Sequence, residues 1–258
     1  MQKSHFEKIA IDAALKAGDY IRKNIGKVKD IHYKGEINIV TDIDKKAENI
    51  IVNTIRKVYP LHNFLAEEGT YTKRNLDFTW IIDPLDGTTN FLHGYPVFCV
   101  SIALEYRGKF LVGVVYDPTR NELFYAKKGK GAFLNKKRIH TSGVNNIKRA
   151  LLATGFAYNV KRAKDDNISR FAKFIKASQA VRRGGSAAID LCYVACGRFD
   201  GFWELGLHPW DSAAALLIVE EAGGKVTQFD GSKYSIYDKE ILASNSKIHS
   251  RMIKILSN

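Results

Sequence analysis

The sequence has few cysteines and no long apolar run. Cysteine occurs three times in 258 residues, and an odd number cannot form a closed disulfide framework, so we expect a reducing compartment. Cys192 and Cys196 share a helix face, but no His or third Cys nearby completes a metal-ligand set, so we interpret them as buried apolar groups. No apolar stretch reaches the roughly 20 residues that span a bilayer, and the first residues lack the apolar core of a signal peptide. These absences favour a cytoplasmic protein.

The chain also lacks internal repeats, low-complexity tracts and long linkers. No Cys or Ser stands in a nucleophile loop, and no His pair has the spacing of a zinc protease motif. A metal-activated water is therefore the more economical nucleophile for a hydrolase of this sequence. With 45% hydrophobic residues, the chain can bury a substantial core as one large domain or two modest ones.

Positive charge is in excess. Lys and Arg number 40 against 27 Asp and Glu, giving a formal net charge of +13 that permits anionic partners. We interpret the basic residues as a surface that steers phosphorylated substrates. The alternative is an RNA-binding surface, which requires the clusters to converge on one face with exposed aromatics between them. The clusters are Lys127, Lys128 and Lys130; residues 136–138; Lys161, Arg162 and Lys164; and Arg182 with Arg183.

Hydrophobic periodicity predicts an α/β chain in two halves. Residues 5–25 have helical spacing, a second helix follows Asp44, and residues 97–126 are typical of an antiparallel meander. Helices and strands alternate in the remainder, with helices expected over residues 186–196 and 211–222. We therefore expect an N-terminal α+β half (1–143) with an antiparallel sheet and a C-terminal α/β half (144–258) with a mixed sheet, packed as one compact unit.

The most informative segment begins with the apolar run Trp80–Ile82 and continues as Asp83-Pro84-Leu85-Asp86-Gly87-Thr88-Thr89. Proline cannot donate to a sheet ladder, so we expect the strand to stop near Asp83. Asp86-Gly87 is a turn signal, and the two threonines suit the first residues of a short helix whose free N–H groups face an anion. The segment thus offers carboxylates for a hard cation and donors for a phosphate.

Acidic residues elsewhere fit the same chemistry. Glu67 and Glu68 follow a short apolar strand, while Asp44 and Asp211 stand where helices begin. Taken singly, Asp44 and Asp211 are equally well explained as helix caps worth about 1 kcal/mol, and the Glu pair as a solvated loop. Taken together, they supply the few carboxylates that Mg²⁺ needs, because water and phosphate complete its octahedral shell.

These residues resemble the inositol monophosphatase family of metal-dependent, lithium-sensitive sugar phosphatases, specifically its bacterial inositol-1-monophosphatase type. Residues 80–91 look like the first family signature, and Pro209-Trp210-Asp211-Ser212-Ala213-Ala214 through residues 220–224 look like the second. Further similar segments are residues 40–44, 67–68 and 182–191. The resemblance implies a layered αβαβα sandwich, usually dimeric. Ala66 replaces a frequent Gly and the segment 69–79 is short, so a trimmed loop over a third metal is expected.

The resemblance also implies residue roles. One Mg²⁺ would be held by Glu67, Asp83 and the Leu85 carbonyl, a second by Asp83, Asp86 and Asp211, and a third, weaker ion would share Glu67. Thr88, paired with Asp44, would help to orient and deprotonate the attacking water near Glu67, so these three residues would be catalytic. The substrate would contact Asp86, Gly87 and Thr88 on the phosphate side, Asp211, the loop of Gly185, Ser186 and Ala187 on the sugar side, and Glu204 at its hydroxyl groups.

The implied activity is Mg²⁺-dependent hydrolysis of myo-inositol 1-phosphate and related small sugar phosphates. Alternatives within the superfamily are fructose 1,6-bisphosphate, 3′-phosphoadenosine 5′-phosphate and histidinol phosphate, of which Glu204 favours a polyol. The alternative from another class is a regulatory protein that binds RNA or the transcription machinery.

Three further motifs have simpler interpretations. Residues 129–131 are interpreted as a hairpin turn, since the complete phosphate-loop pattern is missing. His93 and His208 are expected to be packing or pocket-wall residues. The aromatics Phe199, Phe202 and Trp203 are expected in the core or at a subunit interface.

Overall fold

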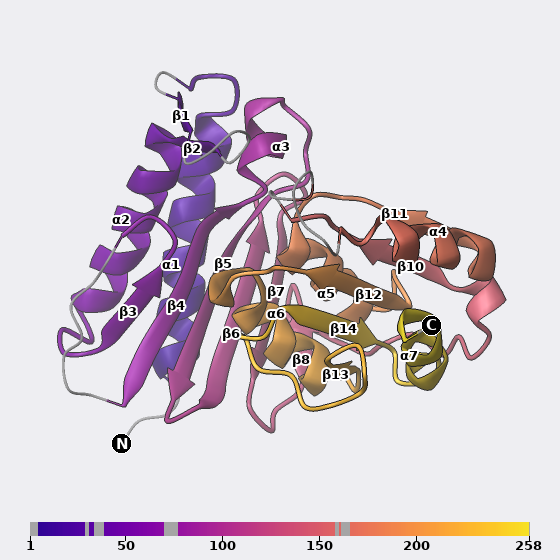
Figure 1. Ribbon diagram of the computed structural model, residues 1–258. Coiled ribbons are helices and arrows are strands. Elements are labelled where there is room, and N and C mark those ends of the chain that lie inside the picture. The colour runs from indigo at the N-terminus through magenta and orange to yellow at the C-terminus, as the bar shows by residue number, and fades with distance from the viewer. Residues whose placement is uncertain are drawn as a thin grey trace.

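The computed structural model describes residues 5–28, 31–33, 39–69, 77–157, 160 and 166–257. Two β-sheets alternate with three layers of helices, so the predicted αβαβα arrangement is confirmed (Figure 1). The helices are α1 (His5–Lys23), α2 (Asp42–Arg56), α3 (Thr88–Leu92), α4 (Ile168–Ala177), α5 (Ala187–Ala195), α6 (Pro209–Glu221) and α7 (His249–Leu256), with a short 3₁₀ helix at Ile147–Arg149.

The larger sheet has seven strands, which are neighbours in sequence order: β3 (Asn63–Ala66), β4 (Phe78–Asp86), β5 (Cys99–Tyr106), β6 (Lys109–Asp117), β7 (Glu122–Lys127), β8 (Ala132–Leu134) and β9 (Lys137–Ile139). It is antiparallel, as predicted, except that β3 pairs with β4 in parallel. A connection of more than ten residues separates β3 from β4, and only a hairpin imposes the antiparallel direction.

The smaller sheet is mixed. Its order is β11 (Ala180–Arg182), β10 (Leu151–Thr154), β12 (Gly201–Leu205), β14 (Glu240–Ser244) and β13 (Lys225–Thr227), with parallel pairs around β10 and antiparallel pairs around β14. A separate antiparallel pair joins β1 (Ile31–Tyr33) to β2 (Ile39–Thr41). The mixed character expected for the C-terminal sheet is thus confirmed.

Helices α1 and α2 cover the outer face of the seven-stranded sheet (Figure 1). The buried stripe of α1 is rich in alanine, which lets the helix approach the strands closely. At Gly18 a Cβ atom would lie 2.4 Å from the Tyr116 ring of β6, so this contact requires glycine. The close packing of α1 fixes the sheet in which the end of β4 carries Asp83 and Asp86.

Helices α5 and α6 lie between the two sheets (Figure 1). Every residue of α6 from Ser212 to Val219 is buried, because sheets cover opposite sides of the helix. A Cβ atom at Gly113 of β6 would lie 2.4 Å from the Ala214 carbonyl oxygen, which shows how tightly α6 packs on the larger sheet. This packing brings the first turn of α6, with Asp211, towards the end of β4.

The outer face of the smaller sheet is covered by α4 and α7 (Figure 1). Trp203 and Phe174 pack there with tilted rings whose centroids lie 4.1 Å apart. Phe202 and Trp203 are buried and Phe199 is half-buried, in agreement with the expected core role. Cys192 is fully buried and Cys196 partly so, also as predicted. No helix in the described part of the chain is long and apolar enough to cross a membrane.

Several boundaries differ from those expected. Strand β4 does not stop near Asp83 but continues through Pro84 to Asp86, because a register shift between Asp83 and Asp86 removes the ladder bond that proline cannot make. The turn at residues 129–131 is held by the Glu221 carboxylate, which accepts N–H bonds from Gly129 and Gly131 at 2.7 and 2.8 Å. It is a hairpin turn, as predicted. The basic cluster at Lys161, Arg162 and Lys164 lies outside the described residues.

Candidate active site

The end of β4 forms one wall of the site. Asp83 is 2% exposed, and its Oδ1 accepts a 2.9 Å hydrogen bond from the Leu85 N–H across the irregular part of the strand. Gly87 follows with φ +95, and a Cβ atom there would lie 2.9 Å from the Val97 carbonyl oxygen. Glycine is therefore required at the turn, and α3 starts directly after it, as predicted.

Asp44 and Thr88 meet although 44 residues separate them. The Thr88 Oγ1 donates to Asp44 Oδ1 at 2.8 Å and also lies 3.0 Å from the Leu85 carbonyl oxygen. We expected Asp44 to be the first residue of α2. It is instead the fourth residue of a capping box whose N-cap is Thr41. Its Oδ2 accepts from the Thr41 N–H at 2.8 Å and from the Thr41 hydroxyl. Burial raises the pKa of Asp44, although these hydrogen bonds oppose the shift.

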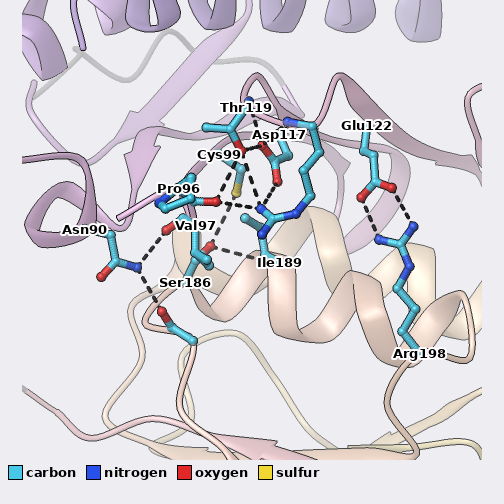
Figure 2. A network of polar contacts seen from close by, with 12 residues as sticks. Asn90, Pro96, Val97, Cys99, Asp117, Thr119, Glu122, Ser186, Ile189 and Arg198 are labelled. Carbon is cyan, nitrogen blue, oxygen red and sulfur yellow. Dashed lines mark hydrogen bonds and ion pairs between the residues drawn. The ribbon is translucent and has the colours of Figure 1, made fainter. Parts of the chain in front are cut away.

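Asp86 connects the end of β4 to the beginning of α5. Its Oδ2 accepts a hydrogen bond from the Ser186 hydroxyl at 2.7 Å and from the Ala188 N–H at 2.8 Å. Ser186 is also the N-cap of α5, as its bond from the Ile189 N–H shows (Figure 2). Burial raises the pKa of Asp86, and the donors at this helix end lower it again. The loop before α5 and the carboxylate at the end of β4 are thus one connected structure.

Asp211 occupies the fourth position of a capping box at the start of α6. Its Oδ2 accepts a 2.7 Å hydrogen bond from the His208 N–H. The simple capping interpretation is therefore correct for both Asp44 and Asp211, but it is incomplete. Burial raises the pKa of Asp211 well above its usual range, and the negative charges of Asp86 and Glu67 raise it further.

Four acidic residues lie close enough to perturb one another. The pKa of Asp83 is raised well above its usual range, first by burial and then by the charges of Glu67, Asp86 and Asp211. These residues come from β4, from the turn after β3 and from the start of α6. Negative charge concentrated in a buried region disfavours the ionised forms unless a cation balances it.

The residues fit a hard divalent cation. In Asp83 and Asp211, a backbone donor holds one oxygen, while no bond from the described protein groups is recorded for the second carboxylate oxygen. In Asp86, the donors Ser186, Ala188 and Cys99 all hold Oδ2. Carboxylate and carbonyl oxygens, without sulfur or imidazole, are the ligands that Mg²⁺ prefers. Among the described residues, no group of three His, Cys, Asp or Glu side chains lies in an arrangement that could hold a metal ion without some movement.

A cavity of about 540 Å³ opens beside these carboxylates. Seven predicted site residues line it, namely Asp86, Gly87, Gly185, Ser186, Ala187, Glu204 and Asp211. Asp44, Glu67, Asp83, Leu85 and Thr88 are not among its lining residues. His208 lines the cavity, stacked on Trp210, as expected for a pocket wall. His93 is exposed at the end of α3 and does not line it, so the expectation for His93 is wrong.

Asn90 and Asp190 are among the polar residues of the cavity that the sequence interpretation did not identify as site residues. The Asn90 amide donates to the Val97 carbonyl at 2.7 Å and to the Gly184 carbonyl at 2.9 Å, and so holds α3 against the substrate loop (Figure 2). Asp190 is 3% exposed in the first turn of α5. An acidic residue inside an otherwise apolar helix was the signal that marks Asp190 in the sequence.

Comparison with known proteins agrees with this fold. The sequence profile of the inositol monophosphatase family matches residues 2–258. An inositol-1-monophosphatase from Synechocystis is 47% identical over 252 residues, 97% of this chain and 88% of that protein. The Nus factor SuhB of Escherichia coli K12 is 45% identical over 248 residues, 95% of this chain and 93% of that protein.

A solved structure of inositol monophosphatase from Anabaena superposes with a TM-score of 0.91 at 42% identity, covering 100% of this chain and 97% of that one. The layered fold, with carboxylates gathered near the end of β4, defines a phosphatase class of protein. The chain belongs to the inositol monophosphatase family and is a phosphatase.

Proposed function

We propose that the protein is a Mg²⁺-dependent phosphomonoesterase that hydrolyses myo-inositol 1-phosphate and related small sugar phosphates, releasing the alcohol and inorganic phosphate. The observation that carries the proposal is a group of neighbouring acidic residues beside a cavity that Glu204 also lines. In this group, the charges of Glu67, Asp86 and Asp211 add to burial in raising the pKa of Asp83. The relative that is 47% identical and named inositol-1-monophosphatase supports the same substrate.

The metal ligands we propose are those that the family resemblance implies. Glu67, Asp83 and the Leu85 carbonyl would hold one Mg²⁺, and Asp83, Asp86 and Asp211 a second, with a third ion sharing Glu67. Bound Mg²⁺ would lower the pKa of the attacking water and offset charge on the phosphate. Because backbone donors fix Asp83, Asp86 and Asp211 beforehand, little reorganisation accompanies binding.

Thr88 and Asp44 are proposed to handle the proton of the attacking water. A threonine hydroxyl has one proton, and the 2.8 Å bond directs it to Asp44. The lone pairs of Thr88 Oγ1 then remain available to accept a hydrogen bond from water and to position it. The N–H groups of Gly87 and Thr88, at the turn that begins α3, are proposed to receive the phosphate.

Kinetics on a substrate panel tests this function. With Mg²⁺ present, we expect kcat/KM for myo-inositol 1-phosphate to exceed that for fructose 1,6-bisphosphate, 3′-phosphoadenosine 5′-phosphate and histidinol phosphate. If inositol 1-phosphate ranks far below any of the others, the substrate assignment is wrong. Calorimetric titration with Mg²⁺ would count the ions, and sedimentation would test the homodimer that we also propose.

A second role is contact with RNA or the transcription machinery. The motivation is the name Nus factor SuhB carried by relatives that are 45% identical, together with the net charge of +13. Arg182 and Arg183 are both exposed, so their charges face solvent. We expect RNA binding that weakens with salt and that persists in the Asp83→Asn variant. Absence of binding at moderate salt would exclude this role, and loss of binding in the variant would tie it to catalysis.

A further inference from the structure

Two acidic side chains line the cavity on the side formed by β12 and α5. Glu204 lies on β12 and is 8% exposed, while Asp190 lies in the first turn of α5 and is 3% exposed. The charge of Asp190 is, after burial, the main cause that raises the pKa of Glu204, so the two carboxylates are near neighbours. The family resemblance assigns a role to Glu204 but none to Asp190.

Neither carboxylate accepts a hydrogen bond or ion pair from the protein, as far as the described residues extend. Asp83, which is 2% exposed, and Asp86 and Asp211, which are half-buried, each accept at least one. A buried carboxylate without donors is costly, and native proteins leave few of them. Both Asp190 and Glu204 line the cavity, so we expect a molecule bound in the cavity to supply the missing donors.

The backbone around the pair leaves it room. At Gly155 a Cβ atom would lie 2.1 Å from Glu204 Oε1, and at Gly184 it would lie 2.9 Å from Asp190 Oδ1. Any other residue at Gly155 would have to displace the carboxylate. A helix-dipole role does not explain Asp190, because an acidic residue on the exposed face of the first turn would give the same stabilisation without being buried.

We propose that Asp190 acts with Glu204 as a specificity-determining residue, and that the two carboxylates accept hydrogen bonds from several hydroxyl groups of a polyol ring. This inference rests on the proposed phosphatase function and deepens it. An ionised carboxylate accepts from up to four directions, so the pair can bind more than one hydroxyl. Arg183 lines the same cavity, and its positive charge favours neutral hydroxyls over a cationic group on the substrate.

The test compares two phosphate esters of the same ring, myo-inositol 1-phosphate and cyclohexyl phosphate, which lacks the other hydroxyls. We expect Asp190→Asn to lower kcat/KM on the inositol ester by about 10- to 100-fold, mainly through KM, the scale of hydrogen bonds to a charged group. The loss on cyclohexyl phosphate should be at least ten times smaller. Asn matches Asp in shape, so folding is preserved, and a thermal melt verifies it.

A matched control is Glu7→Gln, which removes an acidic residue from the first turn of α1, away from the cavity. It should leave both rates unchanged. Equal losses on both esters in Asp190→Asn would make Asp190 structural and overturn the inference. A wild-type enzyme that hydrolyses neither ester, or both equally, would overturn the proposed substrate instead. A wild-type preference for glucosamine 6-phosphate over glucose 6-phosphate would show that the pair binds a cation, and would also overturn the inference.

Discussion

The two sides of the cavity are built differently. On the phosphate side, Asp86 and Asp211 are each held by donors from a helix start, and Asp83 by its own strand. On the proposed hydroxyl side, Asp190 and Glu204 are buried but have no hydrogen-bond donors from the described protein groups. The difference suggests that the groups for the chemical step are fixed in advance, while the groups for substrate selection are completed only by the substrate.

The largest effect is expected on the phosphate side. Asp83→Asn or Asp211→Asn should lower kcat by at least about 1,000-fold, the scale seen when one preorganised electrostatic group is removed. The fold should survive, because each change also removes a charge that raises the pKa of its neighbours. Turnover and circular dichroism measured together check both statements. Near-normal turnover in either variant would contradict the proposed metal ligands.

Mg²⁺ should also stabilise the folded protein through the same side of the cavity. At a concentration 100 times its Kd, an ion that binds only the native state adds about 2.7 kcal/mol to the free energy of unfolding. We expect a rise in melting temperature with Mg²⁺ that a chelator reverses. The same titration with Asp83→Asn should give a much smaller rise, whereas Asp190→Asn should respond as the wild type does. An equal response of all three proteins would place the ion elsewhere.

Asn90 joins the two sides. Its amide donates to the carbonyls of Val97 and Gly184, and so connects α3 with the loop that precedes Asp190 (Figure 2). Asn90→Asp keeps the shape but places an acceptor opposite two carbonyls, which leaves those groups unsatisfied. We expect kcat/KM to fall about tenfold on both inositol 1-phosphate and cyclohexyl phosphate. The reason is that α3 and the loop before α5 would no longer be held in a fixed position relative to each other. An effect confined to the inositol ester would assign Asn90 to the hydroxyl side alone.

The phosphate side was largely predictable from the sequence, because its residues are local. Asp83, Asp86, Gly87 and Thr88 lie within six positions, and strand, turn and helix signals identify their roles in the fold. The continuation of β4 through Pro84 was missed, since a register shift depends on the partner strand β5. Local patterns cannot show such pairing.

The hydroxyl side was only partly predictable. Glu204 and the loop at Gly185 came from the family resemblance, whereas Asn90 and Asp190 were not identified. Their importance depends on contacts across the fold, such as the 94 positions that separate Asn90 from Gly184. The presence of Asp44 and Asp211 alone could not predict a cluster of acidic residues, because both also serve as ordinary helix caps.

The smallest expected effect is on the free energy of unfolding. Removing the charge should raise it for a buried carboxylate without hydrogen-bond donors and lower it for a buried carboxylate that has them. Burial raises the pKa of Asp190 well above the 3.8 of the unfolded chain. The folded protein therefore binds more protons above pH 3.8 and loses stability as pH rises through the raised pKa. Asp190→Asn should remove this loss, so that in a chelator the variant is about 1 kcal/mol more stable at pH 8 and equal to wild type near pH 3.

The control for this prediction is Asp117, which is also buried but accepts hydrogen bonds from Thr119 and Arg120 (Figure 2). Asp117→Asn weakens the hydrogen bonds that this buried carboxylate accepts and its ion pair with the exposed Arg120, and it should lower the free energy of unfolding by about 1 to 3 kcal/mol. Urea unfolding at both pH values gives the two signs directly. If Asp190→Asn also destabilises the protein at pH 8, then Asp190 has a partner in the folded state, and the contrast between the two sides of the cavity is lost.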